Sequence, residues 1–210
     1  MKSTLHSGRP LAEARGAVIL LHGRGSSGQD IMGLGTAFPA DGIAWFAPSA
    51  ARGTWYPHRF LRPVEENEPW LGEALSTVDQ LVEEALQAGL PSERIGLIGF
   101  SQGACLALEY AYRHPRRLAF VGGLSGGLIG PMETARPPVD LLKTPVLLGC
   151  AETDAHVPFA HVEHSARVLK ESGADVTLQK YPGTAHTVFP DELEWLGQRI
   201  RRIGGGIRDE

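Results

Sequence analysis

The sequence contains a serine between two glycines at the end of an apolar segment. Residues 95–100 read IGLIGF, and Ser101, Gln102 and Gly103 follow, so a G-x-S-x-G pattern spans residues 99–103. In a strand-to-helix turn, small residues on either side let the backbone turn sharply and leave the serine hydroxyl exposed. Free N–H groups at the start of the next helix favour the negative charge that forms on an attacked carbonyl. Ser101 is therefore a candidate nucleophile, and the alternative is an ordinary turn in which Ser101 caps the helix.

A nucleophilic serine needs a base, and the base needs an acid to orient it. In folds with this turn, the acid and the histidine follow the serine in that order. Asp154 follows an apolar segment that ends at Cys150, and His186 follows an alternating segment that ends near Tyr181. We expect His186 to accept and return the serine proton and Asp154 to orient His186. Glu152 is the alternative acid. Considered one at a time, Asp154 could instead be a helix N-cap, and His186 could be an ordinary loop histidine.

Small residues also follow the first apolar segment, where residues 22–28 read HGRGSSG. An oxyanion hole takes one backbone N–H from the residue after the nucleophile and one from an early loop of this kind. Gln102 and Arg24 are the expected donors, with Gly23 as the alternative to Arg24. A phosphate-binding loop would end in Gly-Lys-Ser/Thr, and a dinucleotide site would place an acidic residue after the second strand. The sequence has neither feature at these positions.

The other histidines and the two cysteines do not form a recognisable ligand pattern. His156, His161 and His164 are not spaced as a zinc signature, so we expect solvated helix residues and neither a metal nor a cofactor. Cys105 and Cys150 lie in apolar surroundings and do not make a disulfide framework, so we expect two buried free thiols.

A long irregular segment, residues 48–69, follows the second apolar segment and contains Trp55, Tyr56 and Phe60. Loops of this length in a compact domain are usually functional or disordered, and aromatic residues argue against disorder. We expect these three side chains to overhang Ser101 and to line a substrate pocket. The alternative is that they cap the hydrophobic core.

Apolar segments alternate with amphipathic ones along the whole chain, which predicts a mostly parallel sheet with helices on both faces. Because active sites in such sheets lie at the carboxyl ends of the strands, the candidate residues are expected to converge there. No linker divides the chain, so a single domain over residues 1–210 is expected, without a separate lid domain. The expected strands are 17–21, 43–47, 95–100, 118–124, 146–150 and 176–181, the last at an edge. The expected helices are 71–88, 102–113, 158–172 and 191–203.

Composition sets limits on partners and location. The formal net charge of −4 and the pI near 6.1 give no electrostatic reason to expect nucleic-acid binding. No apolar stretch approaches the roughly 18 residues of a membrane span, and residues 1–10 lack the apolar core of a signal peptide. We therefore expect a cytoplasmic protein.

Five sequence segments together resemble the phospholipase/carboxylesterase group of α/β-hydrolases, the small bacterial esterases similar to acyl-protein thioesterases. They are LLHGRGSSG at 20–28, the Trp55-Tyr56 loop, GFSQGACLAL at 99–108, GCAETDAHVP at 149–158 and YPGTAHTV at 181–188. The resemblance implies an α/β-hydrolase fold, Ser101, Asp154 and His186 as the catalytic triad, an oxyanion hole from Arg24 and Gln102, and no cofactor. Arg24 departs from the apolar residue that the thioesterases tend to carry, and the loop at residues 52–70 resembles bacterial esterases of the group more than eukaryotic thioesterases. Long-chain acyl-protein thioesterase activity is therefore not the expected one.

The expected function is therefore that of a serine carboxylesterase that acts on short-chain or small esters through an acyl-enzyme. The expected partner is a small-molecule ester, and a homodimer is compatible with the sequence. A thioesterase or lysophospholipase is the alternative within the same chemistry, because a triad does not select the leaving group. A catalytically silent α/β-hydrolase scaffold is the alternative of another class.

Overall fold

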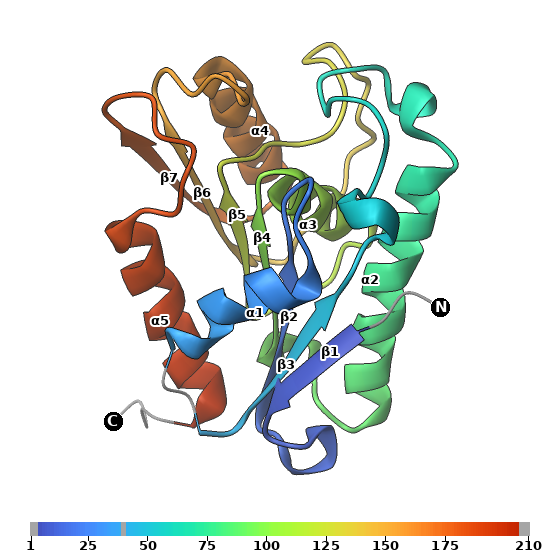
Figure 1. Ribbon diagram of the computed structural model, residues 1–210, viewed down its shortest axis with the longest axis vertical. Helices are drawn as coiled ribbons and strands as arrows, with labels where there is room; N and C mark the ends of the chain where they lie inside the picture. Colours follow the sequence, from blue (N-terminus) through green and yellow to red (C-terminus); the bar gives the residue numbers. More distant parts are fainter. Residues whose placement is uncertain (1–3, 39–40, 206–210) are drawn as a thin grey trace.

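The computed structural model describes residues 4–38 and 41–205, so the ends of the expected domain and residues 39–40 lie outside it. In this described part, seven strands form one sheet in the order β1-β3-β2-β4-β5-β6-β7 (Figure 1). Strand β1 is antiparallel to β3, and the other neighbouring strands are parallel. The strands are β1 (Thr4–Gly8), β2 (Gly16–Leu21), β3 (Ile43–Pro48), β4 (Ile95–Phe100), β5 (Phe120–Leu124), β6 (Pro145–Ala151) and β7 (Asp175–Tyr181).

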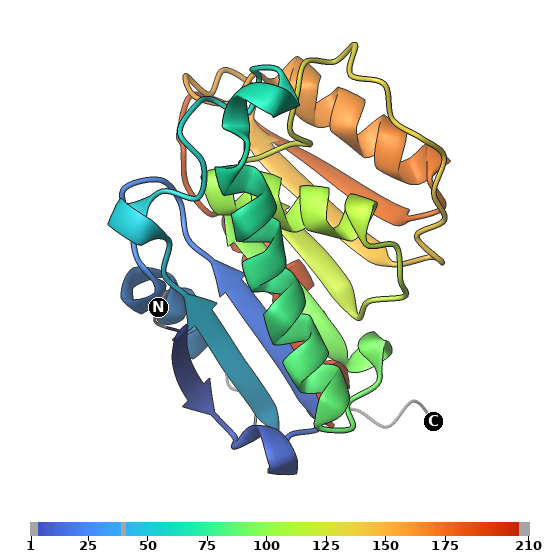
Figure 2. The ribbon, with the colours of Figure 1, turned by 90° about the vertical axis from the view of Figure 1, so that its right-hand side faces the viewer.

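Helices cover both faces of the sheet, as Figures 1 and 2 show. Helices α1 (Gly28–Thr36) and α5 (Pro190–Gly204) pack on one face, and α2 (Trp70–Gln87), α3 (Gln102–Arg113) and α4 (Phe159–Glu171) pack on the other. Successive side chains of a strand point to opposite faces. In β2, Ile19 and Leu21 join the core under α2, α3 and α4, whereas Val18 and Leu20 join the core under α1 and α5. Burial on both faces explains the continuous apolar segments of the sequence.

The expected α/β-hydrolase architecture is confirmed, with all six expected strands, the last of them at the sheet edge. Two elements of the structure were not predicted. Strand β1 is partly or fully exposed along its length, so it lacks an apolar pattern. Helix α1 contains three glycines, which lower its helix propensity; it is capped by Ser27, whose hydroxyl accepts a hydrogen bond from the Asp30 N–H.

The loops after the parallel strands gather at one end of the sheet, at the top of Figure 1. Two long segments meet there: residues 49–69 after β3 and residues 125–144 after β5. The Gly130 N–H donates a 2.7 Å hydrogen bond to the Phe60 carbonyl and joins them. Among the residues that the structure describes, no helix has the length and apolarity needed to cross a membrane.

Candidate active site

The backbone at Ser101 adopts a conformation that non-glycine residues rarely show, with φ 54° and ψ −115°. The glycines around it are required by close backbone contacts. A Cβ on Gly99 would lie 2.1 Å from the Gly103 carbonyl oxygen, and a Cβ on Gly103 would lie 2.0 Å from the Leu21 carbonyl oxygen. The strand β4 and helix α3 therefore meet in a sharp turn that the sequence pattern predicted. Stored strain of this kind is typical of functional sites.

His186 and Asp154 form a short hydrogen bond, with 2.6 Å between His186 Nδ1 and Asp154 Oδ2. The Asp154 side chain is fully buried, and its other oxygen accepts the N–H groups of His156 at 2.7 Å and Val157 at 3.0 Å. Burial alone would raise the pKa of Asp154, but the bonds from His186 and the two N–H groups lower it overall. Asp154 therefore stays ionised and fixes one nitrogen of the imidazole.

The alternative acid, Glu152, does not reach His186. Its carboxylate lies 3.5 Å from Lys180 Nζ and 3.5 Å from the backbone nitrogen of Gly183, and the side chain is exposed. The structure thus brings Asp154, and not Glu152, together with His186.

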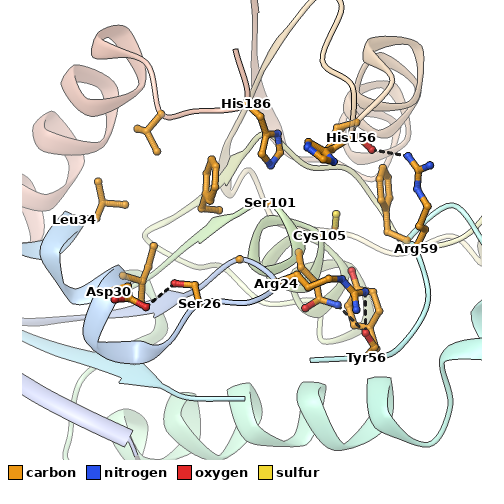
Figure 3. A pocket seen from close by; sticks show the side chains of 17 residues that line it. Arg24, Ser26, Asp30, Leu34, Tyr56, Arg59, Ser101, Cys105, His156 and His186 are labelled. Carbon is orange, nitrogen blue, oxygen red and sulfur yellow. Dashed lines mark hydrogen bonds between the residues drawn. The ribbon is translucent and has the colours of Figure 1, made fainter. Parts of the chain in front are cut away.

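Ser101 and His186 line the same cavity, which has a volume of about 540 Å³ (Figure 3). Within the described part of the chain, no hydrogen bond links the Ser101 hydroxyl to His186. Bonds of this kind often form only when a substrate is bound. The cavity is also lined by residues from several loops, from the end of β4 and from helices α1 and α3. They are Gly23, Arg24, Ser26, Asp30, Ile31, Leu34, Tyr56, Arg59, Phe60, Phe100, Gln102, Cys105, His156, Val157 and Val188.

The expected oxyanion donors lie beside this serine. A Cβ on Gly23 would be 3.4 Å from Ser101 Cβ, so the loop after β2 passes directly next to the nucleophile turn. Within the described residues, neither the Arg24 N–H nor the Gln102 N–H donates a hydrogen bond to a backbone carbonyl. Both groups are therefore available to an oxygen bound at Ser101.

The three expected pocket aromatics separate into two kinds. Tyr56 and Phe60 line the cavity, whereas Trp55 does not. Trp55 is 3% exposed, its Nε1 donates to the His22 carbonyl at 2.9 Å, and its ring lies 4.8 Å from the His22 ring. The expectation that Trp55 lines the pocket is therefore wrong. The Trp55 ring packs in the hydrophobic core, which was the alternative.

Two further expectations about side chains need correction. His161, expected to be solvated, is 4% exposed, and its Nε2 lies 2.8 Å from the Leu128 carbonyl oxygen. His156 precedes α4 and lines the cavity instead of lying on the helix. Both cysteines are buried and free, as expected, and burial raises the pKa of each thiol to about 12.

Sequence reasoning missed several cavity residues. Ile31 and Leu34 were missed because α1 itself was not predicted, and Arg59 because an arginine in a polar segment is usually solvated. The one signal that could have identified Arg59 was its position in the segment 48–69, which was expected to overhang Ser101. Among the described residues, no group of three or more His, Cys, Asp or Glu side chains is arranged to hold a metal ion.

Comparisons with known proteins agree with this geometry. The model of the phospholipase/carboxylesterase family matches residues 8–203. A crystal structure of a phospholipase/carboxylesterase from Dyadobacter fermentans DSM 18053 superposes with a TM-score of 0.90 and 39% identity, covering 95% of this chain and 96% of that one. Carboxylesterase SOBER1 of Arabidopsis thaliana is 26% identical over 211 residues, covering 90% of this chain and 91% of SOBER1.

A third relative carries a different name. Acyl-protein thioesterase 1 of Gibberella zeae is 33% identical over 125 residues, which cover 58% of this chain and 53% of the thioesterase. The family match extends over nearly the whole chain, and the fold and its sheet agree with it. The chain therefore belongs to the phospholipase/carboxylesterase family of α/β-hydrolase enzymes.

Proposed function

We propose that this protein is a serine carboxylesterase in which Ser101 is the nucleophile, His186 the general base and acid, and Asp154 the residue that orients His186. The observation that carries the proposal is the 2.6 Å bond between His186 and a fully buried Asp154, beside the strained Ser101 in one cavity. A base that is itself oriented by a third group next to a nucleophile is the arrangement that acyl transfer requires.

The reaction proceeds in two halves. His186 takes the proton of Ser101 while the hydroxyl oxygen attacks the ester carbonyl, and the carbonyl oxygen becomes negatively charged. The N–H groups of Arg24 and Gln102 stabilise that oxyanion. His186 then protonates the leaving alcohol, which departs and leaves an acyl-enzyme. His186 then deprotonates a water molecule that attacks the acyl group, and it returns that proton to the departing Ser101 oxygen, which releases the acid and restores the free serine.

The substrates that we propose are small or short-chain esters. Tyr56 and Phe60 line the cavity near Ser101. Tyr56 is held in place because its carbonyl oxygen accepts hydrogen bonds from the side chains of Arg24 and Gln102. Rigid aromatic walls oppose long acyl chains, because overpacking typically costs about 1–3 kcal/mol whereas an extra buried methylene gains about 0.8 kcal/mol.

Thioester hydrolysis is the second candidate, because a relative of 33% identity is named acyl-protein thioesterase 1. The same residues would act on a thiol leaving group. A cytoplasmic location, a metal-free mechanism and a homodimer stay predictions.

The test is a chain-length series of 4-nitrophenyl esters beside the matching thioesters. We expect hydrolysis with kcat/KM highest for short acyl groups, and a fluorophosphonate probe to label Ser101. Ser101→Ala should lose on the order of 10³-fold or more in kcat and all labelling. Ser92→Ala, a half-buried serine on a short helical turn before β4 and outside the cavity, is the control and should behave as wild type.

Other results would redirect or reject the proposal. A thioester preference would favour the second candidate, and an optimum at twelve carbons or longer would favour a lysophospholipase. Labelling of Cys105 or Cys150 would reject Ser101 as the nucleophile. Absence of both labelling and turnover in a folded protein would support a silent scaffold.

A further inference from the structure

The cavity that contains Ser101 has two chemically different ends. Figure 3 shows Leu34 and Asp30 at one end, Arg59 and His156 at the other, and Ser101 between them. The first end is largely apolar, with an acid at its rim. The second end presents a guanidinium. An ester that spans Ser101 must therefore place its acyl and alcohol parts in two different electrostatic environments.

Arg59 is held in place but its charge is not neutralised. One of its terminal nitrogens donates a 3.0 Å hydrogen bond to the His156 carbonyl oxygen, which fixes the guanidinium at the cavity wall. In the described part of the chain, no carboxylate lies within 4.0 Å of it. A guanidinium carries five N–H donors, so most of those on Arg59 remain free.

Two neighbouring arginines show the contrast. Arg24 also lines the cavity, but its terminal nitrogens donate to Thr54 Oγ1 and to the carbonyls of three residues within 56–58. Arg62 makes two 2.9 Å bonds to the carboxylate of Glu66 and does not line the cavity. Arg59 thus combines access to the cavity with unused donors and an uncompensated charge.

The opposite end would repel a negative charge. The Asp30 carboxylate accepts the hydroxyls of Ser27 at 2.7 Å and Ser26 at 3.0 Å. These bonds lower the pKa of Asp30, so the rim at this end stays negatively charged. An anionic group is therefore directed away from Asp30 and toward Arg59.

We propose that Arg59 binds a carboxylate of the substrate, so that the preferred substrates are esters that carry one negative charge at the Arg59 end of the cavity. This inference rests on the proposed esterase function. A guanidinium fork matches the geometry of a carboxylate, and Arg59 offers both a positive charge and unused donors, whereas the terminal nitrogens of Arg24 already donate to residues 54–58. The hydrogen bond to His156 orients the fork before substrate arrives, which reduces the entropy lost on binding.

The test compares esters that differ in one charge. On the acyl side, 4-nitrophenyl hydrogen adipate is compared with its methyl-capped form, 4-nitrophenyl methyl adipate. On the alcohol side, 4-butyryloxybenzoate is compared with its methyl ester. We expect wild type to prefer the anionic member of at least one pair, by on the order of tenfold in kcat/KM, and this preference to fall with added salt. The pair that shows the preference identifies which part of the ester lies beside Arg59.

Three variants assign the preference to Arg59. Arg59→Gln should lose most of it, because kcat/KM should fall by on the order of tenfold for the anionic ester and by much less for the methyl-capped ester. Arg59→Lys keeps the charge but not the fork, so it should retain only part of the preference. Arg62→Gln removes a neighbouring arginine that is paired with Glu66, and it should leave the preference intact.

A binding measurement separates this inference from the esterase proposal. In Ser101→Ala, monomethyl adipate should bind more tightly than dimethyl adipate by calorimetry, and adding Arg59→Gln should remove the difference. Equal binding of the two would overturn the inference even if the enzyme proves to be an active esterase. Tighter binding of the anion that depends on Arg59 would support it even if no ester is turned over. A wild-type preference that survives in Arg59→Gln would also overturn it.

Discussion

The side chains of Arg24 and Gln102 donate hydrogen bonds to the same acceptor, the carbonyl oxygen of Tyr56, at 3.0 and 2.8 Å. Arg24 makes three more bonds to oxygens within residues 54–58, and Gln102 Oε1 accepts the Trp55 N–H at 3.0 Å. The two residues whose backbone N–H groups we propose as the oxyanion hole are therefore joined through one loop. Their side chains position that loop, and their backbone N–H groups are the donors that we propose for the oxyanion.

This connection predicts that Arg24 matters beyond its backbone. In Arg24→Met the loop after β2 loses its four contacts to residues 54–58, so the proposed N–H donor is no longer held in place. Removing an oxyanion donor altogether costs about 10²–10³ in kcat, and we expect a loss on the order of tenfold for misalignment. Steady-state kinetics on a short-chain ester measures the effect.

The control for Arg24→Met is Arg52→Met, which removes an exposed arginine outside the cavity. Both variants should retain the wild-type circular dichroism spectrum. A kcat for Arg24→Met within twofold of wild type would show that the loop does not depend on its side chain.

The acid of the proposed triad provides a second prediction. Asp154→Asn keeps the size of the side chain but removes the charge that orients His186, and we expect kcat to fall by on the order of 10³–10⁴. Glu152→Gln alters an exposed carboxylate that does not contact His186, so kcat should stay within about twofold. The reverse ranking in the same ester assay would transfer the role to Glu152.

The sequence was sufficient to predict the central strands and the residues that follow them. Strands β2 to β6 are buried on both faces and therefore read as continuous apolar segments, and Ser101 and Asp154 directly follow two of them. Strand β1 is an exposed edge and helix α1 is rich in glycine, so neither has the periodicity on which such predictions depend.

The walls of the cavity were harder to predict, because residue type does not decide which surface a loop side chain faces. Trp55 and Tyr56 are adjacent aromatics, yet the first packs against His22 and the second lines the cavity. Arginine is usually a solvated residue type, yet the Arg59 guanidinium donates to the His156 carbonyl and lines the cavity. Such placements follow from tertiary contacts that no local pattern contains.

Trp55 and Phe60 are therefore expected to respond differently to truncation. Trp55→Ala removes a buried ring and should cost about 3–5 kcal/mol of unfolding free energy while leaving the acyl-chain optimum unchanged. Phe60→Ala also removes a buried ring and should lower stability, but because that ring lines the cavity it should in addition move the optimum toward longer acyl chains. Urea unfolding and the 4-nitrophenyl ester series measure the two effects. A shifted optimum in Trp55→Ala would contradict the assignment of that ring to the core.

Glu192 is a buried carboxyl group close to the loop that carries His186. One oxygen accepts the Phe189 N–H at 2.7 Å, and the other has no hydrogen-bond partner among the described residues. A Cβ on Gly149 would lie 2.0 Å from that second oxygen, so the carboxyl group is packed directly against β6. Burial raises the pKa of Glu192 from 4.5 to about 7, although the Phe189 N–H lowers it in part.

This raised pKa predicts a specific pH dependence of stability. Between pH 4.5 and 7 the folded protein binds more protons at Glu192 than the unfolded chain does, so this group makes folding less favourable as the pH rises. The loss is complete about one pH unit above the folded-state pKa and amounts to about 3 kcal/mol. Glu192→Gln stays neutral at every pH and keeps an oxygen for the Phe189 N–H. The unfolding free energy of Glu192→Gln minus that of wild type should therefore increase between pH 5 and pH 8.

Urea unfolding of both proteins at pH 5, 6, 7 and 8 measures this difference, and subtraction cancels the other titrating groups. The cancellation matters because His22 has the opposite effect: burial lowers its pKa, so it makes folding more favourable as the pH rises toward 6.5. Glu194→Gln, an exposed glutamate of the same helix, is the control and should show no trend with pH. A difference between Glu192→Gln and wild type that is the same at all four pH values would mean that Glu192 is ionised in the folded protein throughout this range.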